Sequence, residues 1–358
     1  MGGIKVKEGS DRIVRYCTGK STLAIWGVIA VCILIQFGCT PGPTEPESKK
    51  PREYTWTIDT LSYPGSFQTL MLSVWGSSPK NVYAAGHNWS AYGFVYHYDG
   101  SSWQPVSTPF RILSLTGVFG FGANDVWVVG QKDVYPDPSR SAVVVRYNGS
   151  RWYEMSAGNV SMLESIWGSS SSDVWMGGLD GTLLHYDGMS ITPDSAMMTL
   201  ARSIDPASQF FSGASSTPNE TYAALLAAIP GSNGYRCHIF RRHNSTWSRV
   251  DSTYGQTISC LWSAPWGKMY RGTTGVDVLQ DGTWNRLFYA PAIYRICGVA
   301  EDNFFAIGSS IYHWNGKDLF EFKDLHIQGI ELSDVWTDGT EVFIVGNDYK
   351  NTVVYHGR

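Results

Sequence analysis

One recurring phrase constrains the fold of this chain more than any other feature. Its clearest copy runs from Ser73 to Trp103 and reads Ser-Val-Trp-Gly, Asn-Val-Tyr-Ala-Ala-Gly, Val-Tyr-His-Tyr-Asp-Gly and Ser-Ser-Trp. Later copies contain Asp125-Val-Trp-Val-Val-Gly and Asp173-Val-Trp. A repeat of fixed period predicts structural units that stack on their neighbours, because one unit cannot bury its apolar faces alone.

Each copy predicts four strands joined by turns. It holds four short runs of β-branched and aromatic residues, separated by Gly, Asn, Asp and Ser. An Asp-Gly or Asn-Gly pair before the last run favours a two-residue type I′ turn, because that turn needs positive φ at both positions. The pairs are Asp99-Gly100, Asn148-Gly149, Asp187-Gly188, Asp281-Gly282 and Asn315-Gly316.

The spacing of the copies predicts a β-propeller. The anchor aromatics recur every ~44 residues, which is the length of one four-stranded blade. They are Trp75, Phe119, Trp167, Trp262 and Trp336, with Cys297 in the same place. In a degraded fourth copy we expect Phe210-Phe211 to replace the usual Val-Trp. The fold class is therefore all-β, a single propeller of about seven four-stranded blades.

The two ends of the repeat region are expected to close the ring. The last copy stops at Val353–Arg358 and lacks a Trp-bearing fourth strand, whereas an orphan strand at Tyr54–Ile58 precedes the first copy. We expect this N-terminal strand to complete the last blade, which would remove exposed sheet edges. The propeller domain is thus predicted to span residues 54–358.

Residues 1–38 have the pattern of a signal peptide. Five basic and two acidic side chains precede an almost wholly apolar run, Leu23–Phe37. That run of about 15 residues suits a signal sequence and is short for a membrane span. Gly38-Cys39 follows at once, and the arrangement resembles the bacterial lipoprotein signal, which implies cleavage and lipidation at Cys39. An uncleaved short anchor is the alternative.

Residues 39–53 form a Pro-rich polar tether. Either reading of the N-terminus places the body outside the cytoplasm, and the lipoprotein reading anchors it in a bacterial outer membrane or at the cell surface. After cleavage, 22 Lys and Arg would face 29 Asp and Glu, a formal charge of −7. Since no long basic run is present, nucleic acid is not an expected partner.

The phrase resembles known repeat families. Kelch-type blades also have a Gly closing the second strand, a Tyr in the third and a Trp in the fourth. Asp281–Trp284 is similar to part of a sialidase Asp-box turn. The closer likeness is to Trp-Gly-Ser-Ser, Asp-Val-Trp, Gly and His-Tyr-Asp-Gly repeats of secreted and lipid-anchored bacterial proteins, and it covers nearly all of Tyr54–Arg358. This resemblance implies a propeller and says little about chemistry.

The links between second and third strands vary most in length, and in a propeller they share a face with the links between blades. The long ones are His87–Gly93, Gln131–Arg140 and Ala214–Arg236, and the last of these includes 222–228 as a short helix or an extension of the strands. Because loops on a rigid scaffold are the usual place for binding, we expect a ligand at this mouth of the channel. The candidate ligand-binding residues are His87, Trp89, Tyr92, Tyr135, Arg140 and Tyr222, together with Arg111, Arg202 and Arg295, which precede inner strands of different blades.

No motif for catalysis stands out. Gly-x-Ser-x-Gly, His-Glu-x-x-His, phosphate-binding and dinucleotide patterns are absent, and we expect no catalytic residue, metal or cofactor. Cys237, Cys260 and Cys297 have neither disulfide-framework nor zinc spacing. They are interpreted as apolar core residues, with a Cys237–Cys260 bridge as the alternative.

The recurring acids and tryptophans are interpreted as structural. Asp125, Asp173, Asp302 and Asp334 recur beside turns, which favours turn capping over a unique catalytic acid. The recurring Trp residues are interpreted as blade packing rather than a sugar platform.

Three functions remain open on the sequence. The first is a monomeric cell-envelope lipoprotein whose loop-rich face binds a protein or a glycan without catalysis. The second is a carbohydrate-active enzyme at the channel mouth, which requires Arg111, Arg202 and Arg295 to converge with a carboxylate rather than lie ion-paired or solvated in linkers. The third is an envelope assembly factor that grips a partner chain.

Overall fold

The computed structural model describes residues 50–63, 65–88, 92–106, 114–132, 141–217, 219–232, 234–254 and 258–358, with only the backbone described at 92, 93 and 216. The predicted signal peptide, Cys39 and residues 39–49 of the tether lie outside this set. In the described ranges, no helix is long and apolar enough to cross a bilayer. The described part begins with a short 3-10 helix, Pro51–Glu53.

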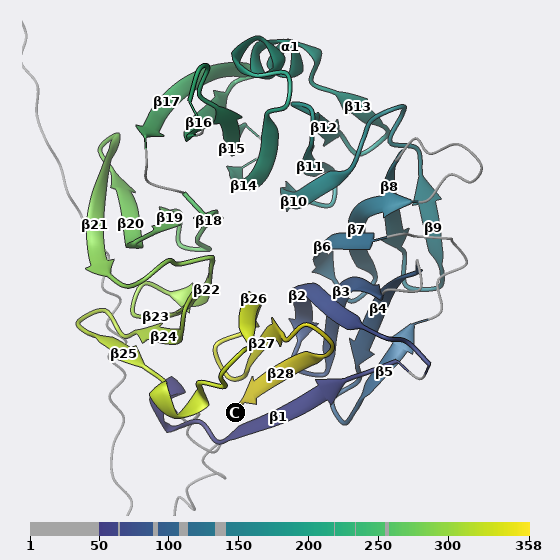
Figure 1. Cartoon of the computed structure of the whole chain (residues 1–358), viewed down its shortest axis with the longest axis vertical. Helices are drawn as coiled ribbons and strands as arrows, with labels where there is room; N and C mark the ends of the chain where they lie inside the picture. Colours follow the sequence, from purple (N-terminus) through teal and green to yellow (C-terminus); the bar gives the residue numbers. More distant parts are fainter. Residues whose placement is uncertain are drawn as a thin grey trace, which may run out of the picture. The chain divides into compact units, whose positions relative to one another are not determined.

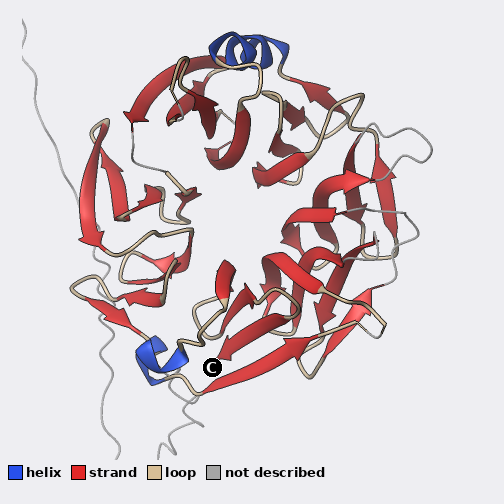
Figure 2. Cartoon of the chain, viewed as in Figure 1, coloured by secondary structure: helices blue, strands red, loops and turns tan. Residues whose placement is uncertain are grey.

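Seven four-stranded antiparallel sheets are arranged as the blades of a propeller, which confirms the predicted fold class (Figures 1 and 2). We number the blades from the first complete one and give their strands from the axis outward. Blade 1 is β2 (Thr69–Ser78), β3 (Asn81–Asn88), β4 (Tyr92–Tyr98) and β5 (Trp103–Val106). Blade 2 is β6 (Ser114–Gly122), β7 (Asp125–Lys132), β8 (Ser141–Tyr147) and β9 (Trp152–Met155). Blade 3 is β10 (Leu163–Ser170), β11 (Asp173–Gly178), β12 (Leu183–Tyr186) and β13 (Ile191–Pro193).

The second half of the ring repeats the plan. Blade 4 is β14 (Gln209–Thr217), β15 (Glu220–Ala228), β16 (Tyr235–His243) and β17 (Thr246–Tyr254). Blade 5 is β18 (Cys260–Ser263), β19 (Met269–Thr273), β20 (Gly275–Gln280) and β21 (Thr283–Tyr289). Blade 6 is β22 (Arg295–Ala300), β23 (Asn303–Ile307), β24 (Ile311–Trp314) and β25 (Leu319–Glu321). Blade 7 is β26 (Glu331–Thr337), β27 (Val342–Asn347), β28 (Thr352–Gly357) and, from the N-terminus, β1 (Trp56–Leu61). A helix, α1 (Ser195–Ile204), joins blades 3 and 4, and a 3-10 turn, Lys323–Leu325, precedes blade 7.

The N-terminal strand closes the ring as predicted. Strand β1 pairs antiparallel with β28 in register from Trp56 opposite Gly357 to Leu61 opposite Thr352. Thr352 then links this last blade to the first, because its hydroxyl accepts the Met71 N–H at 2.8 Å and donates to the Thr69 carbonyl. The ring is therefore closed by the β1–β28 pairing within blade 7 and by hydrogen bonds between blades 7 and 1.

The Trp-Gly pair of the repeat is explained by packing between blades. The Trp75 ring lies over Gly120 of the next blade, where an added Cβ would come within 2.7 Å of it. Trp336 covers Gly76 and Trp167 covers Gly213 in the same way. At these three boundaries the large ring of one blade thus requires a glycine in the next blade.

The fourth copy differs from the prediction. By its pairing with β15, Phe210 occupies the place of Leu115 in β6, and Ala214 stands where the anchor aromatic was expected. The assignment of Phe210-Phe211 to the Val-Trp position was therefore wrong by several residues. Gly213 explains the change, since the Trp167 ring lies against its backbone and no large residue fits there.

The turns before the fourth strands also differ from the prediction. Only at Asp281-Gly282 is φ positive at both residues, 49° and 76°, as a type I′ turn requires. At the other four Asx-Gly pairs only the Gly has positive φ. At Asp99, for example, the carboxylate accepts the N–H groups of Ser101 and Ser102 and so builds a four-residue link instead.

One side-chain triplet recurs in six of the seven blades. A polar residue at or just before the start of the second strand bonds a His or Arg of the third strand, and that His or Arg lies against an aromatic ring of the second strand. In blade 3, Asp173 accepts hydrogen bonds from Trp175 and His185, and the His185 ring stacks on Trp175 with centroids 4.0 Å apart. The carboxylates of Asp125 and Asp173 therefore hold the third strand against the second, a role that the prediction of turn capping did not include; Asp173 also accepts the Ser169 hydroxyl across the turn at 2.6 Å. The triplets are Asn81–Tyr83–His97, Asp125–Trp127–Arg146, Asp173–Trp175–His185, Glu220–Tyr222–Arg241, Asn303–Phe305–His313 and Glu341–Phe343–His356.

One of these histidines also holds the N-terminal segment. His313 is buried, its Nε2 bonds Asn303, and its Nδ1 accepts from the Arg52 guanidinium at 3.4 Å. Arg52 is fixed further by an ion pair with Asp318 at 2.6 Å. Burial, with the nearby Arg52 charge, lowers the pKa of His313 to about 4. The ring is therefore neutral over the physiological range.

His313 is expected to make the propeller sensitive to mild acid. The unfolded chain takes up this proton near pH 6.5 and the folded chain only near pH 4, so stability falls as the pH drops through that window. We expect wild type to lose about 2 kcal/mol more than His313→Gln between pH 7 and pH 4.5. Urea unfolding at both pH values measures the loss, with exposed His326→Gln as control; equal losses in wild type and His313→Gln would contradict the assignment.

Candidate functional site

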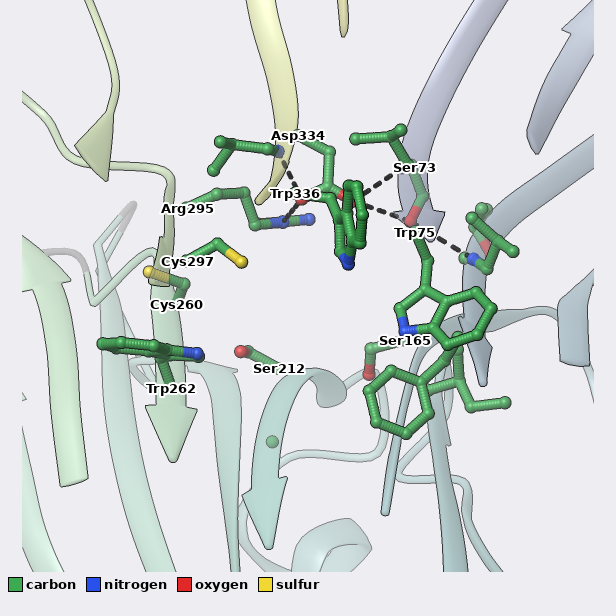
Figure 3. A pocket seen from close by; sticks show the side chains of 18 of the residues that line it. Ser73, Trp75, Ser165, Ser212, Cys260, Trp262, Arg295, Cys297, Asp334 and Trp336 are labelled. Carbon is green, nitrogen blue, oxygen red and sulfur yellow. Dashed lines mark hydrogen bonds and ion pairs between the residues drawn. The ribbon is translucent and has the colours of Figure 1, made fainter. Parts of the chain in front are cut away.

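The seven inner strands enclose a cavity of about 210 Å³ on the propeller axis (Figure 3). Every inner strand contributes three or four consecutive residues to its wall. The lining includes aromatic, charged and thiol side chains. The aromatic ones are Trp75, Phe119, Phe211, Trp262 and Trp336, the charged ones are Glu164, Arg295 and Asp334, and the thiols are Cys260 and Cys297. Such a mixture on the axis is a candidate binding site.

One position forms a ring around this cavity. It lies two residues before the anchor position of each inner strand and is occupied by Ser73, Gly117, Ser165, Ser212, Cys260, Arg295 and Asp334. Small polar residues recur there, so Arg295 and Asp334 stand out as departures. We call these seven residues the axial ring.

The axial ring binds neighbouring blades together. Ser73 Oγ accepts the Val118 N–H of the next blade at 3.2 Å, and Ser212 Oγ accepts the Leu261 N–H at 2.9 Å. Asp334 does the same between blades 7 and 1, since its Oδ2 accepts the Val74 N–H at 2.9 Å. The interpretation of Asp334 as a turn cap was therefore wrong: it stands inside an inner strand and bridges two blades.

Asp334 and Arg295 form the charged part of the ring. The Ser73 hydroxyl donates to Asp334 Oδ2 at 2.7 Å, and Arg295 Nε lies 3.7 Å from Oδ1 (Figure 3). Burial raises the pKa of Asp334, and the Arg295 charge and the hydrogen bonds oppose that rise. Arg295, with 39% of its side chain exposed, is a partly solvated counter-ion to a well-satisfied carboxylate.

Glu164 is the other charged residue of the wall. It is half-buried in β10, three blades away from Arg295, and burial raises the pKa of its carboxyl. Within the described residues it has no hydrogen bond or ion pair with another side chain. Sequence reasoning missed Glu164, because nothing local distinguishes it from an exposed strand residue.

The structure brings only one of the two described candidate arginines to the axis. Arg295 lines the cavity, whereas Arg202 lies on α1 and donates from Nε to the Asp180 carbonyl at 2.8 Å. The convergence required by the enzyme hypothesis is thus not formed by this pair. Arg111, Trp89, Tyr135 and Arg140 lie outside the described residues.

The other candidates take different places. Tyr222 is buried in β15 and donates its hydroxyl to Glu220. Of the two readings of Ala214–Arg236, the strand extension is the one observed: most of the range forms β14, β15 and β16, and the link itself is 229–234. His87 lies half-buried near the end of β3, and burial lowers its pKa. Tyr92 begins β4.

The three cysteines of the propeller are free thiols. Cys260 and Cys297 line the cavity from neighbouring blades, and burial raises their pKa to about 11 and about 12 (Figure 3). Cys237 is buried in β16, and its pKa is likewise raised to about 12 by burial. The bridge between Cys237 and Cys260 is not formed, and protonated thiols suit the predicted role as apolar fillers.

Exposed aromatic side chains gather at the blade ends where second-to-third-strand links and blade-to-blade links lie, an end we call the link face. They are Tyr63, Phe67, Tyr235, Tyr254, Tyr289, Tyr294 and Tyr349. Tyr289 and Tyr349 are each 79% exposed. The repeat pattern does not reveal this set, because its members lie at strand ends and in links rather than at the repeated positions.

A second hollow opens on the link face between blades 5 and 6. It has a volume of about 610 Å³ and is lined by Tyr289, Tyr312, Glu321, Lys323 and His326, among others. This size falls within the usual range for small-molecule or sugar sites, ~300–1,000 Å³. The link face therefore combines exposed rings with a mixed-charge groove.

Known structures share this fold. YCF48 bound to a D1 peptide aligns with a TM-score of 0.58 and 11% identity over 84% of this chain and 94% of that chain. YCF48 from Cyanidioschyzon merolae aligns with a TM-score of 0.55 and 14% identity over 84% of this chain and 98% of that chain. The WD40 propeller domain of Doa1 aligns with a TM-score of 0.53 and 12% identity over 84% of this chain and 96% of that chain. No protein-family model and no curated protein matches the chain. At these identities the likeness shows the fold alone, and the kelch-type and Asp-box resemblance stays a prediction.

The bridging role of Asp334 predicts an unusual order of variant stabilities. Asp334→Val leaves the Val74 N–H and the Ser73 hydroxyl without their acceptor, which should cost about 1–3 kcal/mol. Asp334→Ser installs the residue that bridges blades elsewhere in the axial ring, so we expect it to stay within ~1 kcal/mol of wild type. Urea unfolding measures both. A serine variant no more stable than the valine variant would contradict the role.

Proposed function

We propose that this protein is a monomeric cell-envelope lipoprotein whose propeller binds a protein partner, without catalysis, on the link face. The observation that carries the proposal is the set of exposed aromatic rings at that face, beside the axial cavity. Cys39 would carry the lipid, and the residues after it would tether the propeller to a bacterial outer membrane or cell surface.

The aromatic rings favour a macromolecular partner. Exposed apolar side chains gathered on one face mark interaction sites, and Tyr is enriched in protein interfaces because a rigid ring supplies contact area at small entropic cost. At the opposite end of the described blades, the large exposed apolar residues are Met189 and Val299. The two ends of the propeller thus differ in composition, and the link face is the better docking surface.

A propeller of similar fold supports a peptide-like segment as the bound element, since a solved structure is that of YCF48 bound to a D1 peptide. A glycan is the second candidate, favoured by the tyrosine-lined groove between blades 5 and 6. An enzyme at the same face has less support, because Arg202 bonds the Asp180 carbonyl and does not line the cavity with Arg295.

Loss of two exposed rings is expected to weaken partner binding. We expect Tyr289→Ser combined with Tyr349→Ser to lower affinity for peptides at least tenfold, because each ring is mostly exposed to solvent and available to an interface. The assay is an array of unstructured peptides and a parallel glycan array, followed by titration of the best binder. Met189→Ser, 86% exposed at the opposite end, is the matched control.

A double variant that binds peptides as well as wild type would overturn the protein-binding proposal. Binding confined to the glycan array, and lost in the same variant, would replace it with the glycan alternative.

Cys39 is expected to anchor the protein. In a bacterial host, the wild-type chain should take up labelled palmitate and sediment with membranes, whereas Cys39→Ser should do neither. Cys17→Ser, which alters another cysteine of the N-terminal region, is the control and should be labelled like wild type. Equal labelling of the Cys39→Ser variant would contradict the lipoprotein assignment.

A further inference from the structure

We propose that the axial cavity is a binding site for one positively charged side chain, a lysine or arginine, with Glu164 as its counter-ion. The inference rests on the proposed function and deepens it, because it says what the docked partner inserts.

The charge balance leaves one carboxylate uncompensated. Asp334 already has Arg295 nearby, the Ser73 hydroxyl and two N–H groups, so that part of the wall is electrically satisfied. Glu164 lies half-buried across the ring with no partner among the described residues. A carboxylate withdrawn from water without a partner is unfavourable, and a bound cation would remove that cost.

The aromatic surface favours the same sign of charge. Trp75, Trp262 and Trp336 line the cavity, and Figure 3 shows the Trp75 and Trp262 rings on different sides of it. A ring face that is open to the cavity attracts ammonium and guanidinium groups, because the faces of aromatic rings are negative, and tryptophan does so best. Neutral or anionic side chains gain no such attraction.

The volume limits the occupant to one side chain. At about 210 Å³ the cavity is smaller than the ~300–1,000 Å³ that drug-sized ligands and cofactors occupy. It has space for about seven water molecules at ~30 Å³ each, which is close to the size of a long side chain. A free-standing small molecule is therefore less suited to it than a residue projecting from a larger partner.

The orientation joins the cavity to the proposed docking face. Each inner strand begins at the link face, and Glu164 is the second residue of β10. By strand register Glu164 lies three residues before the anchor position, which Trp75, Trp262 and Trp336 occupy deeper along the axis. A cation entering from the link face would meet the Glu164 carboxylate before the indole rings.

The experiment uses one amino-acid pair that differs only in charge. N-acetyl-arginine amide and the neutral isostere N-acetyl-citrulline amide are titrated into the protein, and binding is followed by calorimetry and by the fluorescence of the tryptophans in the wall. We expect saturable binding of the arginine probe and at least tenfold weaker binding of the citrulline probe. Glu164→Gln should lower affinity for the arginine probe at least tenfold.

The control variant changes the net charge by the same amount as Glu164→Gln but leaves the cavity unaltered. Glu331→Gln also removes a carboxylate from the link-face end of an inner strand, but Glu331 is exposed and does not line the cavity. This variant should therefore bind the arginine probe with the affinity of wild type. Glu164→Gln should be at least as stable as wild type in urea, because it removes an unpaired buried charge; a merely structural Glu164 would give a loss instead.

Three results would overturn the inference: equal binding of both probes, unchanged affinity in Glu164→Gln, or selective binding of N-acetyl-glutamate amide that Arg295→Gln abolishes. If the arginine probe fails while the tyrosine variants still weaken peptide binding, the inference falls and the proposed function stands. If the probe binds as expected but the tyrosine variants have no effect, the cavity site stands and the link face is not the docking surface.

Discussion

The structure depends on how each blade grips the next one. At three blade boundaries a tryptophan ring covers a glycine backbone, as Trp75 does at Gly120, and at three a hydroxyl or carboxylate near the axis accepts an N–H of the following blade. The first contact buries apolar surface and the second satisfies a buried donor. Neither works within one blade, so the blades are stable only as a set.

Much of the fold was predictable because its determinants are local and repeated. Blade length, strand order and the completing strand at Trp56 follow from spacing and turn residues. The degraded fourth copy was misaligned, because Gly213 and Ala214 replace the aromatic anchor and only the strand pairing reveals the register. The Asx-Gly turns were mistaken for two-residue turns, since sequence does not say whether the carboxylate of Asp99 will accept the next N–H groups.

The site was less accessible to such reasoning. Arg295 was among the candidates because it is one of three arginines that precede inner strands of different blades. Asp334 was grouped with the acids of the second strands, although pairing places it on the axis beside Arg295. Glu164 becomes conspicuous only when its surroundings in three dimensions are known, because an unpaired half-buried carboxylate has no sequence signature. The link-face tyrosines escape any repeat analysis, since each blade supplies them at different positions.

The pairing of β1 with β28 has a consequence for biogenesis. The two strands come from opposite ends of the propeller, so the seventh sheet cannot form until the ribosome has made residue 357. Until then, β1 has no partner, and closing so long a loop makes its pairing a late and slow step. A chain interrupted before β28 would expose open strand edges, which makes it an aggregation-prone target for chaperones and proteases.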